Sequence, residues 1–264
     1  MRANVSQLPI AGVCAASLRV LGQGLPVFLR IAAPAAAVVI VTGAVVAAIN
    51  WGVSPTRAGI DPRVFAVTTT PRQFAVIAAG ILVAALALSY AAAATIHAAA
   101  EIASGRRIGV MAAIARVRSK SLQLFWLQWV VNILAVRFSP IAALVLWLLI
   151  APAIPLAVLE DAGPVAAVER TFDRLRGNHL RMFALQLLLL APVLIIPAAL
   201  VWVMLPGQAL DISALSPLAG LALAFPIGIG LLLPVLLLFI ALTLAYQRLA
   251  PESSLHAEDA SNVK

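Results

Sequence analysis

Charged side chains are scarce in this chain of 264 residues. Asp, Glu, Lys and Arg together make up 11% of it, whereas 63% of the residues are apolar and the mean hydropathy is +1.07. Soluble globular domains contain about 25% charged residues, because their surface faces water. The shortage of charge therefore excludes an ordinary soluble domain.

Several long stretches lack charge altogether. Most of them exceed the length of about 20 residues that a helix needs to cross a bilayer. A helix also satisfies its own backbone hydrogen bonds in lipid, where water cannot. We therefore expect an all-α, polytopic membrane helical bundle. The uncharged stretches are residues 31–56, 73–100, 138–159, 182–210 and 212–247, with a shorter sixth at 121–136.

Cysteine and the sequence patterns of known catalytic sites are lacking as well. Cys14 is the single cysteine, which excludes an intramolecular disulfide and a cysteine metal cluster. The chain contains no G-x-S-x-G, H-E-x-x-H or P-loop pattern, and no paired carboxylates within an apolar stretch. We therefore expect no enzyme activity, no cofactor and no metal site.

Basic residues are in excess, with a net charge of +8, but they are not clustered with aromatic side chains that could stack on bases, so we expect no nucleic-acid partner. They sort instead between the two sides of six predicted spans. Fourteen lie on the side of the two chain ends and four, Arg57, Arg63, Arg72 and Arg137, on the other. The positive-inside rule then predicts a cytoplasmic-membrane protein with both termini in the cytoplasm. The predicted spans are 27–50, 73–100, 121–136, 140–159, 180–205 and 217–247.

The third predicted span is short, and an alternative exists for it. Residues 121–136 reach about 24 Å at 1.5 Å per residue, against a hydrocarbon core of about 30 Å. One continuous helix over 121–159 would place Arg137 near the middle of the membrane, at a cost of about 3 kcal/mol, with Pro140 interrupting its hydrogen bonds. A short hairpin is preferred, and whether 121–136 crosses fully stays open.

Proline and alanine distinguish two other spans. The last span, 217–247, is overlong and contains Pro226 and Pro234, so it is either one kinked helix or two helices. The second span contains no proline and ends in the alanine-rich stretch 91–101. Small residues let helices approach closely, so we expect this span near the centre of the bundle.

One ten-residue phrase occurs three times. RVLGQGLPVF at 19–28, RVRSKSLQLF at 116–125 and RLRGNHLRMF at 174–183 share Arg first, Gly or Ser fourth, Leu seventh and Phe tenth. Amphipathic segments of the kind that lie in the membrane interface precede the second and third copies. In the third, Val165, Val168, Phe172 and Leu175 form the apolar stripe.

The phrase is interpreted as a hinge between an interfacial helix and a span. Gly22, Ser119 or Gly177 follows the repeated arginine, and glycine there favours the left-handed conformation that ends a helix. Two predicted spans follow each copy, which gives three units of interfacial helix plus hairpin. All three begin on the same side, so we expect parallel repeats about an axis along the membrane normal.

The repeated arginines are candidate binding residues. Arg19, Arg116 and Arg174 could form a basic ring at the cytoplasmic face that binds an anionic headgroup or substrate. Alternatively, each arginine complements the C-terminus of its own helix and nearby anionic lipid.

His97 and Glu101 form a second candidate, a polar pair at the cytoplasmic end of the second span. Their spacing places both side chains on one helical face, where they could supply two metal ligands or a proton relay. The sequence offers no obvious third ligand, since His179 and His256 lie in cytoplasmic segments. An interfacial ion pair between the two residues is the preferred interpretation.

The stretch PLAVLEDAGPVAAVERTFDRLRG at 155–177 resembles the membrane-domain family named after glycerophosphoryl diester phosphodiesterases, and related bacterial integral membrane proteins. The likeness extends over roughly residues 12–249. It implies a multi-span membrane module. It does not carry over phosphodiesterase activity, because the chain has no room for a catalytic barrel of about 250 further residues. The matching residues are Glu160, Gly163, Pro164, Ala167, Arg170, Arg176 and Gly177, with Thr171 and Phe172 where the family has Ser and Trp.

The sequence thus predicts one transmembrane helical domain over 1–250 and a short, disordered, polar cytoplasmic tail over 251–264. The expected function is that of a non-catalytic scaffold, assembly or lipid-organising module. Its expected partners are anionic lipids on the cytoplasmic side and another membrane protein. A transporter or lipid-translocating protein is the alternative.

Overall fold

The computed structural model describes residues 8–51, 70–118, 120, 124–126, 140–204 and 217–249, and these residues form helices and turns without a strand. The predicted all-α fold is therefore confirmed for this part of the chain. Its helices are α1 (Ile10–Trp51), α3 (Pro71–Ala103), α4 (Val110–Val117), α6 (Pro140–Ile150), α7 (Ala153–Leu159), α8 (Pro164–Arg174), α9 (His179–Met204) and α10 (Pro217–Leu249).

Three stretches of described helix are long and apolar enough to cross a membrane. They are Ile10–Gly43, Ala78–Ala103 and Leu232–Leu249, with mean hydropathies of 2.1, 2.0 and 1.9. At about 1.5 Å per residue, the second stretch alone reaches about 39 Å, which exceeds a hydrocarbon core of about 30 Å. A shorter apolar stretch, His179–Pro192, begins α9. These helices indicate a membrane protein.

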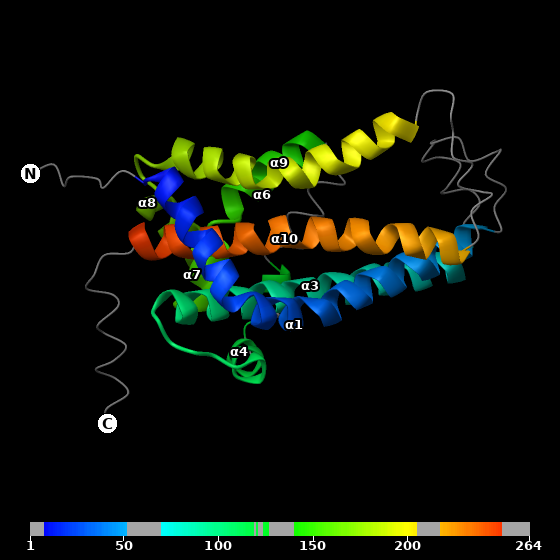
Figure 1. Ribbon diagram of the computed structural model, residues 1–264, viewed down its shortest axis with the longest axis horizontal. Coiled ribbons are helices and arrows are strands. Elements are labelled where there is room, and N and C mark those ends of the chain that lie inside the picture. The colour runs from blue at the N-terminus through cyan, green and yellow to red at the C-terminus, as the bar shows by residue number, and fades with distance from the viewer. Residues whose placement is uncertain are drawn as a thin grey trace, which may run out of the picture.

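The long helices run side by side, and the short helices α4, α7 and α8 lie toward one end of them, while α6 lies alongside α9 (Figure 1). α1 begins and α10 ends at this same end, where α7 and α8 also lie. Leu8, just before α1, donates its backbone N–H to Oδ1 of Asn178, between α8 and α9, at 3.0 Å. The start of the chain is thereby fastened to the third copy of the repeated phrase.

The alanine-rich second half of α3 lies in the centre of the packing, as its alanines predicted, whereas the first half of this helix is largely exposed. α3 packs against α1, α4, α7 and α10. Ala93, Ala94, Ala98 and Ala99, in its second half, are fully buried. Gly24 of α1 lies so close to this helix that a Cβ there would be 2.5 Å from Cδ1 of Ile102. Small side chains therefore set the short distance between α1 and α3.

The predicted helix end at Gly22 is wrong. α1 runs without interruption from Ile10 to Trp51 and contains Gly22, Pro26 and Pro34. Figure 1 shows that α1 instead changes direction along its length. Pro26 lacks the N–H that would bond to the carbonyl of Gly22 one turn earlier, and a kink at such a position is the usual result. The first copy of the phrase is therefore a bend inside one helix.

The predicted span at 140–159 contains two helices. α6 ends at Ile150, a turn follows at Ala151 and Pro152, and α7 begins at Ala153. Pro152 and Pro155 each remove a backbone donor here, which favours a break. The described side chains from Ala153 to Val158 are all buried, so α7 packs inside the protein.

Two questions were open from the sequence: whether the last span is one helix or two, and whether the third span crosses fully. α10 is one helix from Pro217 to Leu249 despite its internal prolines, so the last span is not two helices. Of the third predicted span, only residues 124–126 are described, and they are helical. Whether 121–136 crosses fully therefore lies outside the described residues, as does the tail at 251–264.

Candidate functional site

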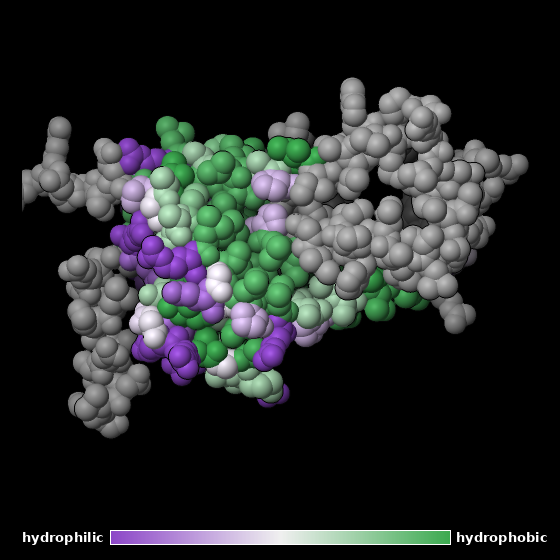
Figure 2. Space-filling view, viewed as in Figure 1, coloured by the Kyte–Doolittle hydropathy of each residue, from purple (hydrophilic) through white to green (hydrophobic). Residues whose placement is uncertain are grey.

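Hydrophilic side chains of the described residues gather at the end where α4 and α8 lie, and the body beside them is apolar (Figure 2). We call this end the polar end. Its exposed basic side chains include those of the turn after α3, of α4 and α8, and of the residues that follow these two helices. Among them are Arg106, Arg107, Arg116, Arg118, Arg170 and Arg176.

Glu160 lies at the centre of a polar cluster that joins three helices. It caps the C-terminus of α7, where its backbone N–H donates to the carbonyl of Leu156 at 2.9 Å. Its Oε1 accepts from Nη2 of Arg174 at 2.6 Å and from the hydroxyl of Tyr246, and its Oε2 lies 3.6 Å from Nη1 of Arg170. We call Glu160, Arg170, Arg174 and Tyr246 the Glu160 cluster. It connects α7, α8 and α10.

Arg174 is held in this cluster from two sides. Its guanidinium carbon lies 5.0 Å from the centroid of the Tyr246 ring, and its Nη1 donates to the tyrosine oxygen. Burial by itself lowers the pKa of Arg174, but the hydrogen bonds to Glu160 and Tyr246 outweigh it and raise the pKa above its ordinary value. The guanidinium therefore stays charged and serves as a fixed hydrogen-bond donor, which excludes it as an acid or base.

Glycine and proline residues mark both ends of α8. Gly163 occupies the N-cap position and Pro164 the first helical position, where a missing N–H costs nothing. Ala167 and Thr171 form its buried face, and Thr171 donates to the carbonyl of Ala167 at 2.7 Å. Gly177 has φ of 86°, the left-handed conformation expected after this helix.

The predicted stripe on α8 has two different environments. Leu175 is 5% exposed and packs in the core, whereas Val165 and Phe172 are 72% and 41% exposed. Arg176, a further matched residue, is exposed and reaches only Oδ1 of Asp173 at 4.0 Å. Apolar and charged side chains thus share the outer surface of α8.

Lys120 and Asp161 fix the turn between α7 and α8, a role that no local sequence pattern indicates. Nζ of Lys120 lies 2.9 Å from Oδ1 of Asp161 and donates to the carbonyl of Val158 at 2.7 Å. Asp161 has φ of 54°, a conformation that aspartate tolerates better than most residues. Lys120 is 14% exposed, so it acts as a structural cation.

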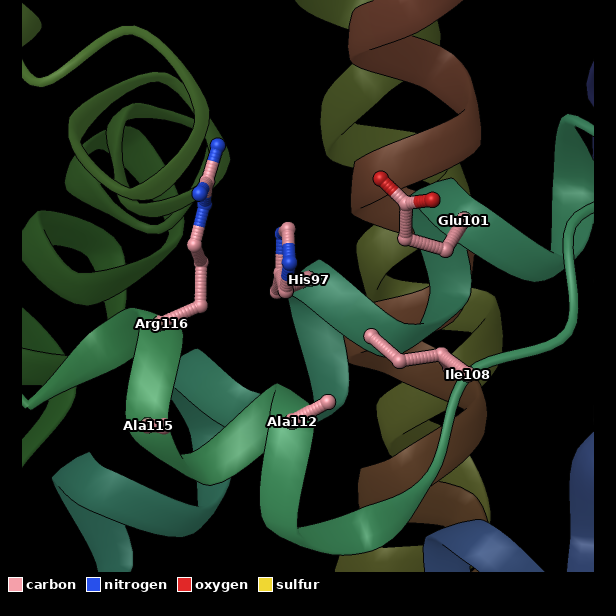
Figure 3. A pocket seen from close by; sticks show the side chains of 6 residues that line it. All are labelled: His97, Glu101, Ile108, Ala112, Ala115 and Arg116. Carbon is pink, nitrogen blue, oxygen red and sulfur yellow. The ribbon is translucent and has the colours of Figure 1, made fainter.

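His97 and Glu101 line a shared groove of about 560 Å³ between α3 and α4. Figure 3 shows the imidazole of His97 between the side chains of Glu101 and Arg116. The hydroxyl of Tyr90 donates to the carbonyl of Ile114 at 3.0 Å and so holds α4 against α3. The groove is open at the polar end.

The preferred ion pair between His97 and Glu101 is not the one in the structure. Oε2 of Glu101 lies 2.8 Å from Nε of Arg106 instead. The reason is the turn after α3, which folds Arg106 back over the last turn of the helix, where Glu101 is. No group of three or more His, Cys, Asp or Glu residues in the described part of the chain is arranged to hold a metal ion.

The three repeated arginines have different surroundings. Arg19 is exposed on α1, Arg116 lines the groove beside His97, and Arg174 belongs to the Glu160 cluster. No described ion pair, hydrogen bond or groove joins two of them.

Tyr246 is one of only two tyrosines in the chain, and no sequence motif predicted its role. Both hydroxyls attach an amphipathic segment to a long helix, Tyr90 through α4 and Tyr246 through α8.

No protein-family model, curated protein or solved structure matches this chain.

Proposed function

We propose that this chain is a multi-pass protein of the cytoplasmic membrane that binds anionic lipid headgroups at its polar end. It acts without catalysis, as a scaffold or lipid-organising module. In this proposal the chain crosses the membrane six times, α6 and α7 together forming the fourth crossing, and both termini lie in the cytoplasm. The three units that follow the repeated phrase, and the resemblance to the phosphodiesterase-associated membrane domains, belong to the same proposal.

The observation that carries the proposal is the mixed surface of the polar end. Met111 on α4 is 76% exposed and Val165 on α8 is 72% exposed, and exposed arginines lie on the same two short helices. Leu180, at the start of α9, is 84% exposed. A helix in the membrane interface inserts its apolar side chains among the acyl chains, while its basic side chains meet the phosphates. α4 and α8 have the composition for that position.

The Glu160 cluster gives this surface a rigid support. Arg174 and Glu160 are 19% and 22% exposed, so their contact lies mostly within the protein. It holds α8 against α7 and α10 while Arg170 and Arg176 remain exposed. A fixed helix can present its arginines to several headgroups without losing further conformational entropy on binding.

The proposal is tested by identifying the lipids that stay with the protein. The full chain is purified in a mild detergent and the bound lipids are measured by native mass spectrometry. We expect anionic phospholipids to be enriched over their share in the membrane extract. Retention of zwitterionic and anionic lipids in proportion to their abundance would contradict lipid recognition.

A transporter is the second candidate, favoured by two buried polar side chains at membrane-compatible positions. Oγ1 of Thr95 on α3 and both amide atoms of Gln186 on α9 are buried without a hydrogen-bond partner in the described part of the chain. Buried polar groups of this kind are costly and are often associated with a path for a solute. Reconstitution in proteoliposomes tests this candidate, and Gln186→Leu should abolish any flux that depends on the amide.

A further inference from the structure

A second groove lies on the other side of the turn that follows α3. It has a volume of about 630 Å³ and runs between the bend region of α1 and the end of α3. It shares Ile108 with the groove of His97, so the two grooves flank one turn. The lining residues on which the inference rests are Gln23, Val27, Ile102, Arg106 and Arg107.

Two glycines produce the shape of this groove. Gly24 allows the close approach of α1 to Ile102, as described above. Gly105, with φ of 77°, ends α3: its N–H donates to the carbonyl of Ile102 and that of Arg106 donates to the carbonyl of Glu101, each at 3.0 Å. This pair of bonds is a Schellman motif, which reverses the chain sharply. The reversal brings two consecutive arginines to the edge of the groove.

The edge of the groove carries an uncompensated positive charge. Arg106 is oriented by Glu101, with Nε at 2.8 Å from Oε2 and Nη2 at 3.3 Å from Oε1. Arg106 is nevertheless 67% exposed, which leaves the remaining side of its guanidinium accessible. Arg107 is exposed and has no ion pair among the described residues. The edge thus has two guanidinium groups and one carboxylate, which pairs with Arg106 alone, and a planar guanidinium can bind two phosphate oxygens at once.

The floor of the groove is apolar. Val27 and Ile102 line it and are partly buried against the core. The two helices that carry them have further exposed apolar side chains nearer their other ends, Val39 and Val41 on α1 and Ile81 and Val83 on α3. A soluble anion would not use these apolar side chains. An amphiphile with a phosphate at one end and an acyl chain at the other matches both parts.

We propose that this groove binds the phosphate of an anionic glycerophospholipid from the surrounding membrane. Arg107 and the accessible side of Arg106 contact the phosphate, Gln23 contacts a headgroup hydroxyl, and the first acyl carbons lie against Val27 and Ile102. The inference rests on the proposed lipid-binding function and assigns it to a site. It also moves the site away from the repeated arginines, to the turn after α3.

The test uses the full chain exchanged in detergent into an equal mixture of phosphatidylglycerol and phosphatidylcholine. Native mass spectrometry then measures the ratio of the two lipids retained by the protein. We expect Arg107→Gln to lower this ratio about tenfold, or about 1.4 kcal/mol, because the arginine attracts the net negative charge of phosphatidylglycerol and repels the choline cation of phosphatidylcholine. Arg248→Gln is the matched control, because it removes the same charge from the end of α10, outside the groove and outside the arginines of α4 and α8.

A second variant separates shape from charge. Gln23 is exposed, so Gln23→Trp fills the groove without changing the charge or the core, and it should lower the ratio as well. If the arginine variant does not fold, this variant decides alone. Circular dichroism and gel filtration establish that each variant is folded.

Three results would overturn the site. One is selective retention of phosphatidylglycerol by the wild type that neither Arg107→Gln nor Gln23→Trp reduces beyond the control; the general lipid-binding function would then survive. Another is displacement of the bound lipid by excess inorganic phosphate, which would assign the groove to a soluble anion. The last is equal retention of the two lipids by the wild type, which would remove the proposed function together with the site.

Discussion

Nη2 of Arg174 lies 2.6 Å from Oε1 of Glu160, so the last residue of α8 is bound to the residue that follows α7. The carboxylate also accepts the hydroxyl of Tyr246 from α10, 86 residues farther along the chain. Three helices that are apart in sequence therefore meet at one carboxylate.

Removing the charge of Glu160 should destabilise the protein clearly. Glu160→Gln leaves the guanidinium of Arg174, which is only 19% exposed, without its carboxylate. A fully buried pair broken in this way costs about 3–5 kcal/mol, and with the partial exposure here we expect about 2 kcal/mol. The measurement is the thermal midpoint in one detergent. Asp173→Asn, at an exposed pair 4.0 Å apart, is the control, and an equal shift for both variants would contradict the assigned role.

The hydroxyl and the ring of Tyr246 should contribute separately. Tyr246→Phe removes the donor to Glu160 and the acceptor for Arg174 but keeps the ring 5.0 Å from the guanidinium. We expect a loss of about 1 kcal/mol for the hydroxyl, and about 1 kcal/mol more for Tyr246→Leu, which also removes the cation–π contact. Hydrogen exchange of α8 should increase in both variants. Protection of α8 equal to that of the wild type would exclude Tyr246 as its anchor.

The two glycines of the repeated phrase should respond in opposite directions to alanine. Gly177 has φ of 86°, so Gly177→Ala forces an L-residue into the left-handed region at a cost of about 1–2 kcal/mol. Gly22 lies within α1 with no atom within 4 Å of an added Cβ, so Gly22→Ala should stabilise the helix by about 0.5–1 kcal/mol. Thermal midpoints of both variants check this. Destabilisation of similar size at both positions would mean that Gly22 also ends a helix.

The polar end should be labelled from the cytoplasm only. Cys14 is the single cysteine, so Cys14→Ser provides a background without thiols. On this background, Arg176→Cys should react with a membrane-impermeant maleimide only after the cells are opened. Pro71→Cys, at the exposed start of α3 on the opposite end, should react in cells with an intact inner membrane. The reverse pattern would invert the proposed orientation.

Local sequence patterns predicted those parts of the fold that depend on neighbouring residues. The apolar lengths gave α9 and α10 nearly to their ends, and the alanines of α3 predicted its central position. Gly177 was identified because a left-handed glycine after an amphipathic helix is a local signal. Gly22 has the same signal, but Pro26 one turn later allows the helix to bend and continue. The identical phrase therefore has two structures.

The remaining features depend on partners distant in sequence. An apolar run such as 153–158 has the same composition whether it faces lipid or protein, so the burial of α7 was not foreseeable. The pairing of Glu101 with Arg106 depends on the Schellman turn between them, which a helical spacing rule ignores. Tyr246 on α10 contacts Glu160, which lies 86 residues earlier in the chain. No residue spacing within α10, or around Glu160, predicts that contact.

The hydrogen bond from Leu8 to Asn178 has a consequence for synthesis. Its two residues are 170 positions apart, and a ribosome adds about 5–20 residues per second, so the donor waits on the order of ten seconds or more for its acceptor. During that time the beginning of α1 cannot reach its final environment, whatever has already been inserted into the bilayer. Leu8, near the beginning of the polypeptide, is thus among the last residues to find its hydrogen-bond partner. A nascent chain released before Asn178 is synthesised lacks the acceptor for this hydrogen bond.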